Sequence, residues 1–209
     1  MDERLRRAAE RAIGFMPEAE GLALYEAACG VAERGPLLEI GSYCGTSSIY
    51  LGAAASAANG VVFSIDHHRG SEEHQPGEAY HDTRLVDTDG GLVDTLGEFR
   101  RTIQAAELAN TVIGIIGDSS RVAAHWGTPL ALVFIDGSHS LEAATLDYEG
   151  WAPHVMPRGL LAIHDVFKEP AEGGRPPYEI YRRALRSEAF AEVGCQDSLR
   201  VLQRIGDGL

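Results

Sequence analysis

The sequence predicts a doubly wound α/β fold, in which helices cover both faces of a mostly parallel, seven-stranded sheet. Five short apolar runs alternate with helical segments along the chain. Such alternation is typical of parallel strands joined by helical crossovers. Residues 191–205 then form two strand-like stretches on either side of Gln196-Asp197. This tail predicts a hairpin that adds the last two strands, one of them reversed.

The expected elements follow from hydrophobic periodicity and from residues that begin or end helices. Thr46 stands near the N-cap of one helix, and Asn59-Gly60 ends it because both residues tolerate a left-handed backbone. Strands are expected over residues 37–41, 61–66, 111–116, 130–135 and 159–163. Helices are expected over residues 3–13, 18–33, 46–58, 92–108, 119–126, 141–155 and 176–190.

The length favours one domain over residues 1–209. Residues 1–34 supply N-terminal helices ahead of the first strand. Residues 67–91 are polar and rich in His, Gly and acidic side chains, so they predict a long loop. Because long loops in compact domains are often functional, this segment is expected to be a lid-like insertion, with Arg69 and Tyr80 as candidate acceptor contacts.

Composition excludes several classes of protein. The chain is 44% hydrophobic and 23% charged, which suits a packed core. A formal charge of −13 argues against binding to nucleic acid or to an anionic membrane. No apolar run approaches the length of about 20 residues that spans a bilayer. Three cysteines without a pair motif fit a reducing, cytoplasmic location. A small-molecule partner is therefore expected, and a homodimer is left open.

Polar groups follow two of the predicted strands directly. Asp136-Gly137-Ser138-His139 comes after the run 130–135, and His164-Asp165 comes after the run 159–163. The carboxyl ends of parallel strands meet at one edge of the sheet, where ligands bind in open α/β folds. Two carboxylates and an imidazole at that edge suit a hard divalent cation. The alternatives are helix N-caps or loop ion pairs for the two acids, and an orienting role for His164.

The first strand leads into a glycine loop, Glu39-Ile40-Gly41-Ser42-Tyr43-Cys44-Gly45. Its spacing is neither the dinucleotide-binding nor the P-loop pattern. Asp66 ends the second strand, where a carboxylate can accept hydrogen bonds from ribose hydroxyls. Gly117-Asp118-Ser119 ends the third strand and could hold an adenine edge. Three such strand ends in this order predict a nucleoside-containing cofactor.

These motifs resemble class I S-adenosylmethionine-dependent methyltransferases over roughly residues 35–205. The resemblance implies a Rossmann-like methyltransferase fold with a reversed C-terminal hairpin. The DGSH and LLAIHD segments are similar to those of small bacterial metal-dependent O-methyltransferases. The implied cofactor contacts are Glu39, Gly41, Ser42, Gly45, Ser47, Asp66, His67, Asp118, Ser119 and Asp136.

The resemblance also implies a metal site. In catechol-type relatives an Asp after strand four and an Asp-Asn pair after strand five hold magnesium. Asp136 matches the first ligand, whereas the pair here is His164-Asp165. The resemblance implies a divalent metal, with Mg²⁺ as the expected ion. Its implied ligands are Asp136, His164 and Asp165, and whether His164 binds the metal directly is open.

The implied activity is O-methylation of a small polyhydroxylated acceptor, a sugar or glycoside. Asp136 and His139 are the catalytic candidates, with His139 as the general base; its alternative is a helix-capping contact. A phenol or catechol acceptor is a second reading. Two alternatives belong to other functional classes: a nicotinamide-dependent oxidoreductase and a non-catalytic module that binds S-adenosylmethionine. Glu142, Asp147 and Glu149 are expected to form a solvated helix face.

Overall fold

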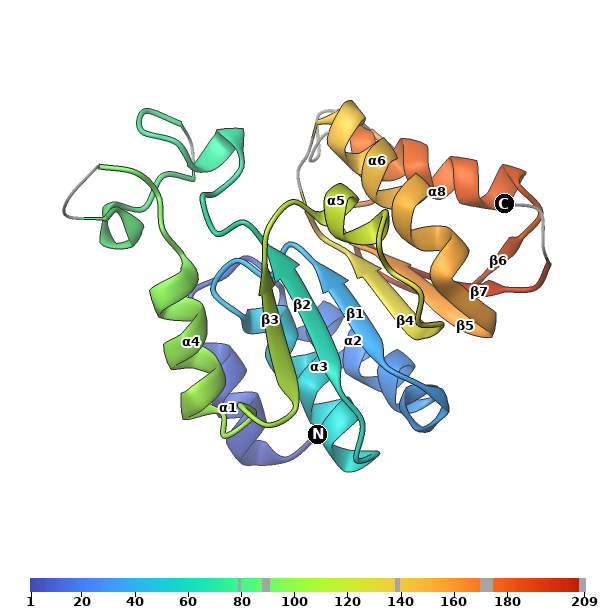
Figure 1. The fold of residues 1–209 in the computed structure, drawn as a ribbon, viewed down its shortest axis with the longest axis horizontal. Helices are drawn as coiled ribbons and strands as arrows, with labels where there is room; N and C mark the ends of the chain where they lie inside the picture. The colour runs from blue at the N-terminus through green and yellow to red at the C-terminus, as the bar shows by residue number, and fades with distance from the viewer. Residues whose placement is uncertain (79, 88–90, 138–139, 170–174, 207–209) are drawn as a thin grey trace.

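The computed structural model describes residues 1–78, 80–87, 91–137, 140–169 and 175–206. Its centre is a seven-stranded sheet in the order β3-β2-β1-β4-β5-β7-β6 (Figure 1). The strands from β3 to β5 are parallel; β7 pairs antiparallel with β5, and β6 pairs antiparallel with β7, so β7 alone is reversed. The strands are β1 (Leu37–Ile40), β2 (Val62–Asp66), β3 (Val112–Ile116), β4 (Leu130–Ile135), β5 (Val155–Ile163), β6 (Phe190–Gln196) and β7 (Leu199–Arg204).

Helices cover both faces of the sheet, as expected. One face packs against α1, α2, α3 and α4, and the other against α5, α6 and α8 (Figure 1). The helices are α1 (Glu3–Arg11), α2 (Glu18–Cys29), α3 (Thr46–Ala57), α4 (Leu96–Ala105), α5 (Ser119–Ala123), α6 (Leu141–Trp151) and α8 (Pro176–Arg186). Short 3₁₀ turns are η1 (Ala32–Arg34), η2 (Glu72–His74), η3 (Thr83–Leu85) and η4 (Ala152–His154).

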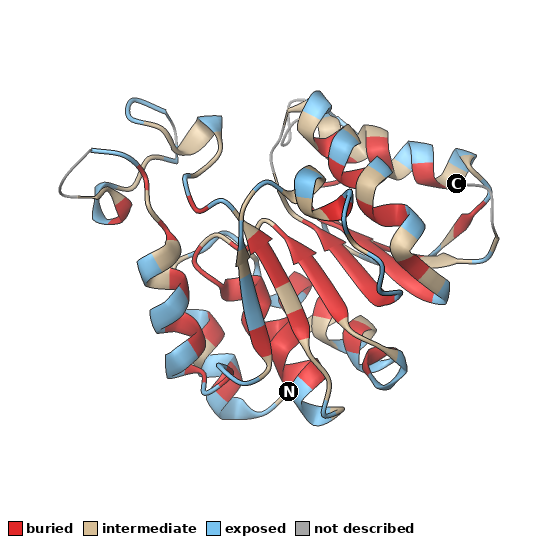
Figure 2. Ribbon diagram, viewed as in Figure 1, coloured by how far each residue is buried: buried red, intermediate tan, exposed pale blue. Residues whose placement is uncertain are grey.

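The core follows the central strands. Every residue of β1 and β4 is buried (Figure 2), because helices cover both of their faces. This explains why both strands are continuous apolar runs rather than alternating ones. The predicted fold class, including the reversed hairpin, is therefore confirmed. Among the described residues, no helix is both long and apolar enough to cross a bilayer.

Several expected boundaries were wrong: α2 ends at Cys29 rather than at residue 33, and α6 ends at Trp151 rather than at residue 155. Helix α4 begins at Leu96 rather than at residue 92, because Val93 forms an antiparallel bridge with Val86. Strand β5 begins at Val155 rather than at residue 159. Val155 pairs with Leu130 ahead of a register shift, and Pro157 and Arg158 interrupt the apolar pattern between Val155 and the rest of the strand. Helix α3 begins at Thr46, as expected, and its N-cap is Gly45 in a left-handed conformation.

The insertion between β2 and α4 contains no long element among its described residues. It holds the two turns η2 and η3, and it stands at the carboxyl edge of the sheet (Figure 1). Its ends are tied down, since the Thr95 amide donates to the His68 carbonyl at 3.1 Å. The Arg69 guanidinium lies 3.5 Å from carboxylate oxygens of Asp87 and Asp94.

The close approach of β1 and β4 generates a test of the fold. Gly41 has a φ of +85°, and a Cβ there would lie 2.1 Å from the carbonyl oxygen of Asp136. Gly41→Ala should therefore lower the free energy of unfolding by more than about 1 kcal/mol. Gly97→Ala is the matched control, because Gly97 lies in α4, where an added Cβ would make only ordinary contact with the end of the Arg101 side chain, and it should be neutral or stabilising by roughly 0.5–1 kcal/mol. Urea denaturation measures both; equal midpoints would contradict the prediction.

Candidate functional site

Strand register gathers the predicted site at one sheet edge. Ile40 pairs with Ile135, and Ile135 pairs with Ile163. The residues that follow directly are Gly41 after β1, Asp136 after β4 and His164 after β5. Parallel strands that end in register place these three residues side by side, which is why the sequence motifs converge.

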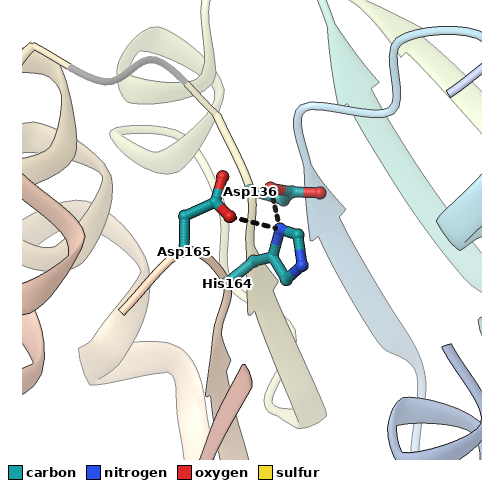
Figure 3. A group of neighbouring side chains, drawn as sticks. All are labelled: Asp136, His164 and Asp165. Atoms are coloured by element: carbon teal, nitrogen blue, oxygen red, sulfur yellow. Dashed lines mark hydrogen bonds and ion pairs between the residues drawn. The ribbon is translucent and has the colours of Figure 1, made fainter. Parts of the chain in front are cut away.

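Asp136, His164 and Asp165 form a compact cluster (Figure 3). The Nδ1 atom of His164 lies 3.0 Å from Asp136 Oδ1 and 3.5 Å from Asp165 Oδ1. One donor atom from each residue falls within 4.8 Å of the others. Asp165 reaches this position with a φ of +56°, a left-handed conformation that is uncommon for a residue with a side chain. The prediction that the three side chains converge is correct.

The opposite ring nitrogen of His164 contacts an acid from the N-terminal region. His164 Nε2 lies 2.6 Å from Glu20 Oε2, and both side chains are almost fully buried. Glu20 Oε1 accepts hydrogen bonds from the amide of Ser198 at 2.5 Å and from its hydroxyl at 2.8 Å. Glu20 therefore joins helix α2, the end of β5 and the β6–β7 turn.

The charges of this network depend on one another. Burial opposes a positive imidazole, but Asp136, Glu20 and Asp165 outweigh it and raise the pKa of His164 to about 11. Burial also opposes the Glu20 carboxylate, yet hydrogen bonds from His164 and Ser198 hold its pKa below the usual range. The carboxylates around His164 thus favour the protonated imidazole. A cation at Nδ1 would replace one proton and leave the Nε2–Glu20 bond in place.

Asp66 lies at the end of β2, as the sequence predicted. Its Oδ2 accepts from the amide of Tyr43 at 2.7 Å, and its Oδ1 accepts from the amide of His68 at 2.7 Å. These bonds fix the carboxylate against the glycine loop. Asp66 also lines a cavity of about 180 Å³, so lone pairs remain for a ligand.

Asp118 and Ser119 lie at the end of β3, on the wall of the same small cavity. Asp118 is the N-cap of α5 and accepts from the amide of Arg121 at 2.9 Å. The Ser119 hydroxyl donates to Asp147, a residue of α6. Asp147 is only 6% exposed, so its assignment to a solvated helix face was wrong. Burial raises its pKa to about 6, an effect that the Ser119 hydrogen bond partly offsets.

Glu39 lies beneath the glycine loop rather than on a cavity wall. Its carboxylate is fully buried and accepts hydrogen bonds from the hydroxyls of Ser47 and Ser48. Burial raises its pKa to about 7 despite those bonds. Glu39 therefore braces the start of α3, and a direct contact between Glu39 and a cofactor stays a prediction.

The remaining candidates lie nearby. Ser42 and Ser47 line the larger cavity, His67 lines the smaller one, and Gly45 is the N-cap of α3. The buried hydroxyl oxygen of Ser42 has no hydrogen-bond partner within the described part of the chain. His139, the predicted general base, lies outside the described residues together with Ser138.

Two adjoining cavities meet at the cluster. The larger encloses about 1230 Å³ and is lined by Glu20, Asp136, His164 and Asp165, with residues from three other segments. The smaller runs between Asp66 and Asp118. Gly41, Tyr43, Asp136 and Gly137 line both cavities. A molecule in the small cavity can therefore reach into the large one beside Asp136.

The chain matches a known protein family over most of the sheet. Residues 38–166 match the methyltransferase domain family, which is more than half of the chain. The chain belongs to this family. The predicted resemblance to class I S-adenosylmethionine-dependent methyltransferases is confirmed.

Solved structures of methyltransferases share the fold. The O-methyltransferase TomG from Streptomyces achromogenes, involved in tomaymycin synthesis, is 15% identical, with a TM-score of 0.67 over 99% of this chain and 91% of TomG. An O-methyltransferase from Bacillus cereus is also 15% identical, with a TM-score of 0.67 over 99% and 92%. A putative caffeoyl-CoA O-methyltransferase from Staphylococcus aureus is 13% identical, with a TM-score of 0.64 over 96% and 90%.

Two functional residues were missed although the sequence held a signal for each. Glu20 shares the buried side of α2 with Leu24 and Ala28, at a spacing of four residues. Asp147 similarly falls on the buried side of α6, three residues after Ala144 and four before Trp151. A carboxylate on an apolar helix face requires a buried partner, and this signal was not used.

The Glu20 network predicts a large effect of a single substitution. Glu20→Ala leaves His164 Nε2–H and the Ser198 amide buried without an acceptor. The free energy of unfolding should fall by about 3–5 kcal/mol, the cost of removing one partner from a buried ion pair. Glu18→Ala on the same helix is the control, because its exposed pair with Arg6 is worth about 0–1 kcal/mol. Similar denaturation midpoints for the two variants would refute the role of Glu20.

Asp147 predicts a pH dependence of stability. Its folded pKa of about 6 exceeds the usual value near 3.9, so the folded state retains a proton that the unfolded chain releases. Relative to Asp147→Asn, the wild type should lose stability as pH rises from about 4 to about 6, and the difference should stay constant above that range. Urea titrations at intervals of half a pH unit measure it. Glu149→Gln, an exposed site on the same helix, should run parallel to the wild type; a constant difference for Asp147→Asn would contradict the prediction.

Proposed function

We propose that this methyltransferase moves the methyl group of S-adenosylmethionine to a hydroxyl oxygen of a small acceptor, with a divalent cation at Asp136, His164 and Asp165. The observation that carries the proposal is the cluster itself, which lies where the two cavities meet. A donor whose nucleoside end fills the small cavity presents its other end beside the cluster. The acceptor then approaches from the large cavity.

The small cavity suits the donor. Asp66 already holds two backbone amides and has lone pairs left for ribose hydroxyls. Gly41 lacks a side chain where β1 approaches β4, so the backbone can approach a ligand closely. The Ser42 hydroxyl borders the large cavity and has no partner among the described residues, so we propose that it binds the polar end of the donor. These features support S-adenosylmethionine as the co-substrate.

The cluster suits a hard divalent cation such as Mg²⁺. Two carboxylates and one imidazole are ligands of the right chemical type, and they already converge. The Glu20 contact to His164 Nε2 is the kind of carboxylate interaction that orients a metal-binding histidine. A bound cation would lower the pKa of an acceptor hydroxyl and orient it.

Residues of the protein itself would position the donor and the acceptor. Gly41 and Asp136 line both cavities, so a donor in the small cavity and an acceptor in the large one would meet beside these two residues, which favours an aligned reaction. The proton of the acceptor hydroxyl needs a base, and His139 is proposed for this role because it follows Asp136 by three residues. Asp136 is the alternative base.

Oxygen as the accepting atom is supported by the similarity to TomG and the Bacillus cereus enzyme, both O-methyltransferases, and to the putative O-methyltransferase from Staphylococcus aureus. The sequence-based proposal of a sugar or glycoside acceptor, and its phenolic alternative, belong to the same activity. The antiparallel hairpin weighs against a nicotinamide-dependent dehydrogenase. A single domain, a cytoplasmic location and a homodimer stay predictions.

The donor assignment is tested at Asp66. Asp66→Ala removes both proposed ribose acceptors and should weaken binding of S-adenosylhomocysteine by roughly 1.5–3 kcal/mol, the range for charged hydrogen bonds. Glu107→Ala is the control, because Glu107 is an exposed acid far from both cavities. Isothermal titration calorimetry measures both. Unchanged affinity in Asp66→Ala would remove the ribose assignment.

The metal and the base are tested separately. Asp136→Ala and Asp165→Ala should abolish Mn²⁺ binding, followed by electron paramagnetic resonance, and should also abolish turnover. His139→Ala should keep Mn²⁺ binding and lower turnover by about 10²–10⁴, the usual scale for loss of a general base. Binding of S-adenosylhomocysteine should persist in Asp165→Ala and His139→Ala. Full activity after exhaustive chelation would exclude a metal-dependent reaction, and near-normal turnover in His139→Ala would assign the base to Asp136.

A further inference from the structure

The larger cavity has a wall of aromatic rings that the chemistry above does not use. Phe15 lies between α1 and α2, Tyr43 lies in the glycine loop, and His74 and Tyr80 belong to the insertion. Three segments that are distant in sequence thus supply one ring cluster. We call these four residues the aromatic wall.

The rings contact one another directly. Tyr43 and His74 are stacked, with centroids 4.8 Å apart and planes at 26°. Phe15 lies 5.6 Å from Tyr43 and meets Tyr80 edge-on at 5.2 Å. These distances are typical of favourable aromatic pairs. The wall is therefore an ordered surface that a further ring could extend.

Two members of the wall remain open to solvent. Phe15 is 57% exposed and Tyr80 is 54% exposed, although both line the cavity. Large apolar side chains that gather at an open cavity, rather than in the core, are typical of binding sites. Phe15 and Tyr80 therefore lose exposed apolar surface when a ligand fills the cavity.

The wall is coupled to the donor site through Tyr43. The Tyr43 amide donates to Asp66 Oδ2, the proposed ribose acceptor, while its ring stacks on His74. Tyr43 also lines both cavities. A ring held against the wall is consequently positioned relative to the donor, which an acceptor requires.

The volume leaves room for such a ring. The larger cavity encloses about 1230 Å³, above the roughly 300–1,000 Å³ of common small-molecule pockets. Part of it must take the methyl-bearing end of the donor. The remaining volume is larger than a single hydroxylated ring at the Asp136 cluster would occupy.

We propose that the aromatic wall is an acceptor subsite that binds a planar aromatic ring, while a hydroxyl of the same acceptor lies at the Asp136 cluster. This inference rests on the proposed function and narrows its acceptor to a compound that carries an aromatic ring. A bare sugar does not satisfy it, whereas a sugar with an aromatic substituent does.

The test compares a probe with a sugar alone, a probe with the same sugar on an aromatic ring, and a probe with that ring alone. They are methyl β-D-glucopyranoside, 4-methylumbelliferyl β-D-glucopyranoside and 4-methylumbelliferone, each titrated with and without S-adenosylhomocysteine. Calorimetry on the full chain should show that the two ring-containing probes bind at one site. The methyl glucoside should bind at least about tenfold more weakly.

Variants of the wall locate the ring. Phe15→Ala and Tyr80→Ala should each weaken the ring-containing probes about three- to tenfold, the range expected for losing one aromatic pair. Phe15→Tyr and Tyr80→Phe should restore binding, because they keep a ring. Leu92→Ala removes an equally exposed apolar side chain outside both cavities and should change nothing. Both wall residues are more than half exposed, so the variants should melt at the wild-type temperature.

Several results would overturn the subsite. Equal affinity for methyl glucoside and its aromatic analogue would do so, as would ring binding that is unchanged in both alanine variants. Absence of saturable binding by either ring-containing probe would also do so. Failure of the proposed function is seen separately, as loss of S-adenosylhomocysteine binding in the wild type without any probe.

Discussion

The buried contact between Glu20 and His164 is the interaction on which the site depends. Isolated charges are costly inside a protein, so each of these groups requires the other. Glu20 also accepts two hydrogen bonds from Ser198, and His164 also contacts Asp136. One carboxylate thus fixes an N-terminal helix, a central strand and the C-terminal hairpin around the same imidazole.

This arrangement makes the N-terminal region part of the site. Helix α2 supplies Glu20, and the segment before it supplies Phe15. Both precede residues 38–166, which match the methyltransferase domain family. The family region provides the strand ends that hold donor and cation in our proposal. The flanking residues contact His164 and form one side of the larger cavity.

Burial separates supporting acids from those that can meet a ligand. Glu39 and Asp147 are buried, and both have raised pKa values because desolvation outweighs their serine hydrogen bonds. Asp66 and Asp136 are only partly buried and line cavities, whereas Asp147, although it borders the smaller cavity, is buried and accepts from Ser119. The sequence predicted acids at strand ends correctly, since apolar runs place them there. It did not show which carboxylate faces a cavity and which lies beneath the loop, because the same motif position is compatible with either.

The sequence by itself determined the strand–helix order, the reversed hairpin and the convergence of Asp136, His164 and Asp165. These follow from local periodicity and from the rule that parallel strands end at one edge. Only the tertiary structure decided that Glu20 reaches His164 from 144 residues away, and that Phe15 meets Tyr80. Such contacts depend on how α2 and the insertion pack across the sheet, and packing between distant segments leaves no periodic pattern in the chain.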